Sequence, residues 1–155
     1  MSPPSSSLAK KNDACCLYRK EVERLHEFFV GWFSGQLDKQ PSLLQADCHD
    51  RFSDDFSMVV PSGNVVTKAQ LVDRLNLDSH GCHGPSFRIN IPDFELLQQY
   101  SETLTLVRYV EVQHRGGDDQ ETKTVNARIS TAVLEQADNV VLWRHVHETS
   151  LPNEG

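Results

Sequence analysis

Residues 140–148 read VVLWRHVHE, and this stretch has the alternating pattern of a β-strand. Side chains two positions apart in a strand point to the same face of the sheet. We therefore expect Trp143, His145 and His147 to share one face. The opposite face is expected to carry the residues around them, Leu142, Arg144 and Val146. The first face would combine an indole with two imidazoles, which suits ligand binding or proton transfer near neutral pH.

The strand pattern extends backwards through the second half of the chain. It predicts five strands, at residues 87–91, 94–99, 103–113, 123–135 and 140–148. The segments 116–119 (GGDD) and 137–139 (ADN) have the composition of hairpin turns between the last three strands. This half is therefore predicted to form a sheet of long antiparallel strands.

The first half has helical periodicity instead. Between residues 14 and 37, apolar side chains recur at steps of three and four, which predicts one long amphipathic helix. Gly31 and Gly35 indicate either the end of this helix or the close approach of another segment. A second helix is expected from Pro41 to about Phe52, and a third over residues 68–77, capped by Thr67 and Gln70.

Two short strands are predicted between these helices, at residues 56–60 and 65–66, with a turn at 61–64. Three helices followed by long antiparallel strands is a segregated α+β order, in which the sheet buries one face against the helices. The 155 residues favour one domain. We expect this domain at residues 14–150, with a disordered Ser- and Pro-rich tail at 1–13 and another tail at 151–155.

Charge and hydropathy restrict the partners. The chain has 15 Lys and Arg against 22 Asp and Glu, a net charge of −7, so a nucleic acid partner is not expected. The longest strongly apolar stretch, residues 28–33, is too short to cross a bilayer, and no secretory signal is recognisable. Four cysteines lack any Cys-x-x-Cys spacing. We expect a cytoplasmic protein with reduced thiols and no membrane partner.

The order of elements resembles the nuclear transport factor 2-like superfamily over about residues 15–150. The resemblance rests on Phe52-Ser-Asp-Asp-Phe56 leading to Pro61-Ser-Gly63, on the capped helix at Thr67, and on the ending WRHVHETS at 143–150. This ending is similar to the final strand of the calcium/calmodulin-dependent kinase II association domain. The resemblance implies a cone-shaped fold in which a curved antiparallel sheet wraps around the long N-terminal helix and encloses a pocket.

Enzymes of this superfamily can be compared position by position. Steroid isomerase members place a general-base Asp before the Pro of the first hairpin, where this chain has Val60, and a Tyr on the first helix, where it has Phe28. Neither residue transfers a proton, so this chemistry is not expected. The association domain has an Arg after the Thr of its penultimate strand, whereas Ala132 follows Thr131 here. Arg128, four residues before Ala132, is the candidate replacement on the same strand face.

The predicted ligand-binding residues are Trp143, His145, His147, Arg128 and Ser130, with Trp32, Phe56 and Met58 as apolar contacts, although these three fit a plain core better. Catalytic candidates are His145 and His147, with Asp55 as a carboxylate that orients a histidine, as in the dehydratases and polyketide cyclase-like members of the superfamily. Two alternatives remain open. In the first, the imidazoles only stabilise the fold by hydrogen bonding to buried acceptors. In the second, the adjacent acids Asp54 and Asp55 form a solvated turn.

A metal site has weaker support. His80, Cys82 and His83 offer three donors in one loop, but zinc needs four convergent ligands, or three and water, and paired ligand spacing is absent. We expect neither a metal ion nor another cofactor.

Three functions therefore stay open. The preferred one is a pocket that binds a small amphipathic or acidic molecule. The alternative is an assembly module that pairs through its outer sheet face, and both imply a homodimer because such a face leaves an apolar patch. The third is a cofactor-free lyase or isomerase of the dehydratase or cyclase type that uses the histidine pair. Without a visible nucleophile motif, we favour binding over catalysis.

Overall fold

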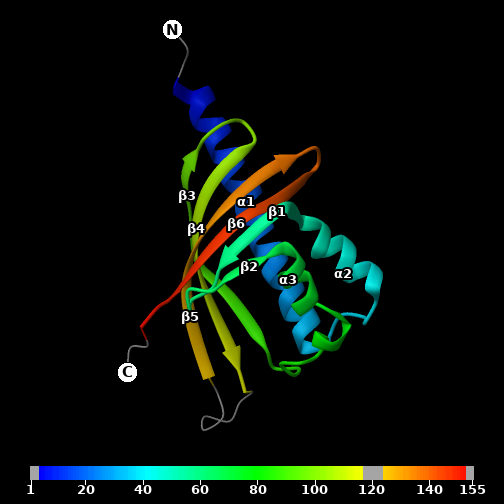
Figure 1. Ribbon diagram of the computed structural model, residues 1–155. Helices are drawn as coiled ribbons and strands as arrows, with labels where there is room; N and C mark the ends of the chain where they lie inside the picture. The colour runs from blue at the N-terminus through cyan, green and yellow to red at the C-terminus, as the bar shows by residue number, and fades with distance from the viewer. Residues whose placement is uncertain (1–3, 117–123, 153–155) are drawn as a thin grey trace.

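The computed structural model describes residues 4–116 and 124–152, and only the backbone of residues 4–11. The helices are α1 (Pro4–Ser34), α2 (Pro41–Asp47) and α3 (Lys68–Arg74), with single 3₁₀ turns at His49–Arg51 and Leu77–Ser79. The strands are β1 (Phe52–Val59), β2 (Val65–Thr67), β3 (Arg88–Gln99), β4 (Leu104–Arg115), β5 (Thr124–Ala137) and β6 (Val140–Ser150). Figure 1 shows their arrangement.

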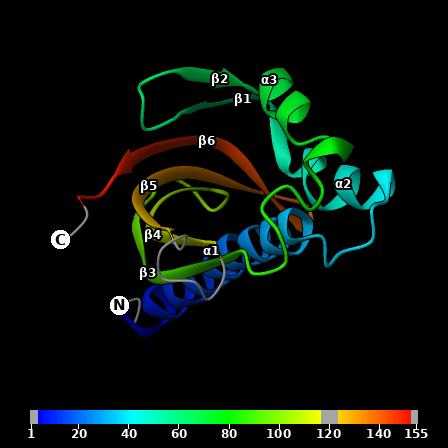
Figure 2. The same cartoon turned by 90° about the horizontal axis from the view of Figure 1, so that it is seen from below.

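The six strands form one sheet in the order β2-β1-β6-β5-β4-β3. The sheet curls around α1, while α2 and α3 lie at the end where α1 finishes (Figure 2). This confirms the α+β class that the order of elements predicted and the curved sheet that the resemblance implied. One feature differs from the expectation: β1 pairs with β6 in parallel, so the sheet is mixed instead of wholly antiparallel. The parallel pair is allowed because α3 and the β3–β5 meander separate the two strands along the chain.

The element boundaries follow the predictions with two corrections in the middle of the chain. Phe52, assigned to the second helix, begins β1, because that helix ends at Asp47. The strands predicted at 87–91 and 94–99 are one strand, β3, whose pairing with β4 shifts between Asn90 and Asp93. Pro92 lies in this shift, where its missing N–H removes no regular ladder bond. Of the predicted turn at 116–119, residues 117–119 lie outside the described residues.

The N-terminal segment is a further correction. The expected disordered tail is helical from Pro4, so α1 begins ten residues before the predicted start at residue 14. Proline is favoured at the first helical position, and Leu, Ala and Lys residues follow it. Adding turns to an established helix is much easier than starting one, and the amphipathic part of α1 provides that start.

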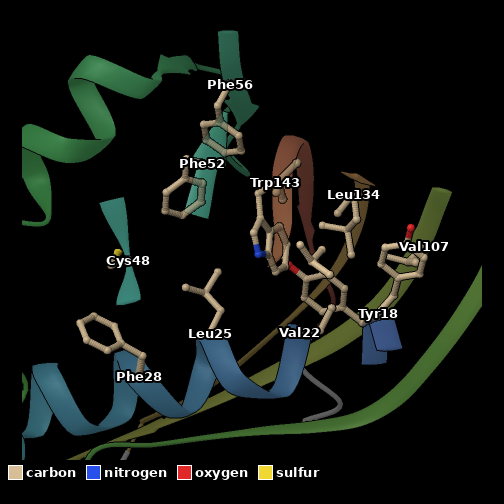
Figure 3. Close-up of a cluster of buried hydrophobic side chains, with 14 of the residues drawn as sticks. Tyr18, Val22, Leu25, Phe28, Cys48, Phe52, Phe56, Val107, Leu134 and Trp143 are labelled. Atoms are coloured by element: carbon tan, nitrogen blue, oxygen red, sulfur yellow. The ribbon is translucent and has the colours of Figure 1, made fainter. Parts of the chain in front are cut away.

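The core lies between α1 and the concave face of the sheet. Figure 3 shows Trp143 of β6 between Leu25 of α1 and Phe52 and Phe56 of β1. These side chains are all nearly inaccessible to solvent. The periodic residues of α1 that the sequence singled out, such as Tyr18, belong to the same cluster. Across the described part of the chain, none of the helices is long and apolar enough to span a membrane.

Candidate functional site

The core does not fill the cone completely. A cavity of about 270 Å³ remains between the concave sheet face, α1, α3 and the loop before β3. Its lining combines two kinds of side chain. The apolar ones are mainly Phe29, Phe33, Phe52, Phe56, Met58, Leu71, Leu75 and Phe87. The polar ones are mainly His26, Tyr109, Glu111, Gln113, Arg115, Arg128 and Glu148.

His26 and Glu111 form a buried ion pair among the polar lining residues. The Nε2–H of His26 donates to Oε1 of Glu111 at 3.0 Å, and its Nδ1–H donates to the Val22 carbonyl oxygen at 2.7 Å. A backbone carbonyl can only accept, and so can an ionised carboxylate. Both ring nitrogens therefore carry protons, and His26 is an imidazolium with no proton left for a ligand.

The pKa values of this pair agree with that assignment. Burial opposes the charged form of both groups, but each partner stabilises the other's charge by attraction and hydrogen bonding. The net result raises the pKa of His26 above its ordinary 6.5 and lowers that of Glu111 to about 2. Glu111 is therefore a poor base, and the pair stabilises the cavity wall instead of exchanging protons with a substrate.

A row of hydrogen bonds continues from this pair along β4 to the cavity mouth. Gln113 donates to Oε2 of Glu111, and its own oxygen accepts from Nη2 of Arg115 at 2.9 Å. The Arg115 guanidinium also lies 5.7 Å from the centre of the Phe87 ring. Burial and the positive charge of Arg115 lower the pKa of His83, so that imidazole is neutral at pH 7.

The second ion pair in the cavity is looser. Nη1 of Arg128 lies 3.4 Å from both carboxylate oxygens of Glu148. Charge-assisted bonds of this type are usually about 2.7–2.9 Å long. Burial, with a smaller contribution from the negative charge of Glu111, raises the pKa of Glu148 although Arg128 lowers it. Burial also raises the pKa of Tyr109 well above 10, so its phenol stays protonated.

Trp143 of β6 lines the cavity and is held by a buried hydrogen bond. Its indole Nε1–H donates to Oε2 of the buried Glu21 at 2.9 Å. Glu21 in turn accepts two hydrogen bonds from Arg24 and lies 3.6 Å from Arg51. The ring is thereby fixed while its edge faces Tyr109, with the two ring centres 6.2 Å apart.

The structure divides the predicted ligand-binding residues into two groups. Trp143, Arg128, Phe56 and Met58 line the cavity. Ser130 is fully buried on the same sheet face but lies outside the cavity lining. Trp32 is fully buried, donates to the Ser79 hydroxyl at 3.0 Å and likewise does not reach the cavity.

The expectation that His145 and His147 share the face of Trp143 is wrong. The β5–β6 pairing places Trp143 opposite Leu134 but His145 opposite Val133, so Arg144 is an extra residue in β6. Such a β-bulge shifts the alternation by one position. Val146 and Glu148, instead of the two histidines, therefore follow Trp143 into the cavity. His145 pairs with the Ser57 hydroxyl at 3.1 Å, and His147 is exposed.

The remaining candidates also lie apart from the cavity. Asp55 is exposed and binds Arg144 at 2.9 Å on the outer face; a hydrogen bond from Ser53 lowers its pKa. His80 donates to the Leu37 carbonyl oxygen at 2.6 Å, and Cys82 is exposed; only His83 of this loop reaches the cavity. Within residues 4–116 and 124–152, no three His, Cys, Asp or Glu side chains are placed to hold a metal ion.

Sequence reasoning missed His26, Glu111 and Glu148. Two signals were present. His26 lies four residues after Val22 and three before Phe29, so it occupies the apolar stripe of α1. Glu111 alternates with Val107 and Tyr109 on the buried face of β4. Polar residues at such positions must find buried partners. Glu148 could not be found in this way, because the bulge that turns it inward leaves no trace in the alternation.

Comparison with known proteins gives no matching family model and no curated relative. Solved structures do match. An NTF2-like protein of unknown function from Pseudomonas aeruginosa is 31% identical, with a TM-score of 0.74; the alignment covers 88% of this chain and all of that one. The level of identity and full coverage indicate a shared family beyond a shared shape.

More distant structures share the fold alone. The association domain of Caenorhabditis elegans CaMKII is 12% identical with a TM-score of 0.62, covering 93% of this chain and 98% of that domain. A putative scytalone dehydratase from Novosphingobium aromaticivorans is 12% identical with a TM-score of 0.65, covering 91% and 89%. Both an association domain and a putative enzyme thus occur on this architecture.

Proposed function

The chain belongs to the NTF2-like family, and on that premise we propose that its cavity binds a small amphipathic molecule with an acidic group. The observation that carries this proposal is that one cavity is lined by both aromatic side chains and charged groups. Binding sites commonly combine an apolar lining with a few polar groups that orient the ligand. The volume of about 270 Å³ suits a compact molecule.

The charges that line the cavity favour an acidic ligand. Three cationic groups, His26, Arg115 and Arg128, face two carboxylates, Glu111 and Glu148. The surplus is one positive charge when both carboxylates are ionised, and more when Glu148 is protonated. A monoanion would neutralise this surplus, while its apolar part replaces water against the phenylalanines.

A thermal-shift screen of small acids, steroids and aromatic metabolites tests the proposal. A ligand at about a hundred times its Kd adds about 2.7 kcal/mol to the stability of the folded state. For a chain of this size, about 1 kcal/mol raises Tm by about 2–4 °C. We expect acidic amphipathic compounds to stabilise the wild type, and the shift to be lost in Arg128→Gln and in Phe56→Ala.

The matched control is His147→Ala, since this histidine is exposed on the outer face. It should keep the full ligand-dependent shift. A screen in which no compound stabilises the wild type, or in which His147→Ala abolishes the shift while Arg128→Gln keeps it, would refute the cavity as the binding site.

We also propose a homodimer, which the outer sheet face supports. Leu106 lies opposite Val133, and Val110 lies opposite Ile129, on the face away from the core. All four side chains are partly accessible. The Arg108–Thr131 pair lies between these two apolar pairs. Partly exposed aliphatic side chains gathered on one sheet face are commonly covered by a partner. Two copies would bring identical patches together around a twofold axis.

Light scattering tests the dimer. The wild type should have twice the 17.5 kDa mass of one chain. Val110→Asp should shift it to a monomer, whereas Val65→Asp, on the opposite edge of the sheet, should leave the dimer intact. A monomeric wild type at micromolar concentration would contradict the proposal. We do not propose a dehydratase mechanism based on the histidine pair, because His145 and His147 lie outside the cavity.

A further inference from the structure

We propose that the acidic group of the ligand binds Arg128 in place of Glu148, and that Glu148 takes up one proton from solvent as the ligand binds. The inference rests on the proposed function and specifies how the ligand is recognised. It names the ligand class, a carboxylate with an apolar body, and adds a measurable consequence, proton-coupled binding.

Arg128 is the cation of the cavity interior with the least satisfied bonding. Its side chain is 17% exposed, and the distances from its Nη1 to the two Glu148 carboxylate oxygens are both 3.4 Å. Its Nε is buried and has no hydrogen-bond partner among the residues that the structure describes. A guanidinium offers five N–H donors in a planar fork that matches a carboxylate. An incoming carboxylate would make shorter, paired bonds there.

The other cations of the cavity are already engaged. Both N–H groups of His26 bond Val22 and Glu111. Arg115 lies at the mouth, where it donates to Gln113 and lies against the Phe87 ring. An acidic group that enters the interior therefore meets Arg128 as the cation able to rearrange.

Glu148 depends on Arg128 for its charge. Glu148 is 8% exposed, and the charged groups that act on it are Arg128 of β5, Glu111 of β4 and His26 of α1. The phenol of Tyr109 on β4, whose pKa is raised by burial and by these carboxylates, stays protonated. Arg128 is its hydrogen-bonded cation, whereas Glu111 repels it and His26 is already paired with Glu111. A ligand carboxylate on Arg128 removes the favourable contact and adds a second repelling charge. Under these conditions the neutral acid is the more stable form of Glu148.

The direction of the pH effect follows. In the free protein, the pKa of Glu148 is raised by burial, and in the complex it rises further. Between these two values, binding consumes a proton, so affinity falls as pH increases through that interval. Below the pKa of the free protein, Glu148 is already protonated. Above the pKa of the complex it stays ionised, and the linkage vanishes at both ends.

Isothermal titration calorimetry with phenylacetate and its neutral amide, phenylacetamide, tests the proposal. Each titration is run at several pH values in two buffers of different ionisation enthalpy, which gives the number of protons taken up. For the wild type we expect phenylacetate to bind at least about tenfold more tightly than the amide. We also expect phenylacetate to take up as much as one proton, and the amide none.

Two variants separate the roles. Glu148→Gln should bind phenylacetate as tightly as the wild type or more tightly, without proton uptake and with affinity independent of pH. Arg128→Gln should lose the preference for the acid over the amide. The control is Glu135→Gln, whose carboxylate pairs with Arg144 on the outer face at 3.1 Å. It should keep both the preference and the proton uptake.

The outcomes distinguish this inference from the function on which it rests. Equal binding of acid and amide without proton uptake would overturn the inference and leave a cavity that binds amphipathic molecules. Proton uptake that persists in Glu148→Gln would also overturn it, even if Arg128→Gln fails to fold. If neither probe binds and the thermal-shift screen finds no ligand, the proposed function fails as well.

Discussion

The imidazole of His26 is the most constrained group of the site. It donates from both nitrogens, and both of its acceptors are buried. Its ring also packs edge-on against Tyr109, with the ring centres 5.3 Å apart. Among the described residues, removing the imidazole alone would leave the buried Glu111 carboxylate with Gln113 as its one hydrogen-bond donor. The pair is therefore a stability element of the cavity wall as much as a part of its electrostatics.

We predict that His26→Leu lowers the free energy of unfolding by about 3–5 kcal/mol, because it leaves an uncompensated buried charge. Urea denaturation measures this loss. The matched control is the double variant His26→Leu/Glu111→Leu, which removes both charges and should recover most of the stability. A single variant as stable as the wild type would show that the pair contributes nothing.

The same pair predicts a pH profile of stability. The raised pKa of His26 contributes stability that is complete below 6.5 and is lost as pH rises through its higher folded-state pKa. The lowered pKa of Glu111 contributes stability present above 4.5 and lost as pH falls towards about 2. Tm should therefore be highest between these limits. In the double variant, the decline on both sides should be smaller; an unchanged profile would contradict the assignment.

Residue identity alone could not locate the site. Alternation placed Trp143 correctly, and Arg128 lines the cavity as its position relative to Ala132 suggested. The same alternation failed two residues after Trp143, because Arg144 forms a bulge. A bulge depends on how β6 pairs with β1 and β5, and strict counting along one strand cannot detect that.

At the scale of elements, the end of α1 determines one wall of the cone. The chain reverses after Ser34 through Gly35, which has a φ of +82°, and the N–H of Leu37 donates to the Gly31 carbonyl oxygen at 2.9 Å. The Leu37 side chain lies directly over Gly31, where a Cβ would be only 2.6 Å from its Cγ. The two glycines thus serve the two roles that the sequence suggested, close approach and helix termination.

We predict that Gly31→Ala destabilises the protein, although alanine is favoured over glycine inside a helix by about 1 kcal/mol. The added methyl group must displace Leu37, which packs against the core. In a Leu37→Ala background the same substitution should be neutral or stabilising. Thermal unfolding of the four proteins measures this reversal of sign, and a stabilising Gly31→Ala in the wild type would contradict the packing described here.

Elements with local signals were predicted well, and those that depend on tertiary contacts were not. The capping box of α3 is present, with Gln70 N–H donating to the Thr67 hydroxyl at 3.3 Å and the Gln70 side chain accepting from Thr67 N–H. The parallel β1–β6 pair had no sequence signal, because strand direction depends on how the intervening chain returns to the sheet.

At the scale of the whole molecule, the cavity lies between α1 and the sheet that curls around it. Its lining comes from α1, α3, the loop before β3 and five of the six strands. Residues as distant in sequence as His26 and Glu148 meet there. The resemblance to NTF2-like proteins implied a pocket, but its polar residues, which come mainly from α1, β4, β5 and β6, could be brought together only by the coordinates.

The most direct test of the central claim, that a ligand occupies this cavity, is NMR of methionine methyl groups labelled with carbon-13. The chain has two methionines, Met1 and Met58, and Met58 is one of the apolar residues that line the cavity. On titration with phenylacetate, the Met58 signal should shift and saturate with the affinity that calorimetry gives, while the Met1 signal stays in place. A Met58 signal that does not move at saturating phenylacetate would contradict the account.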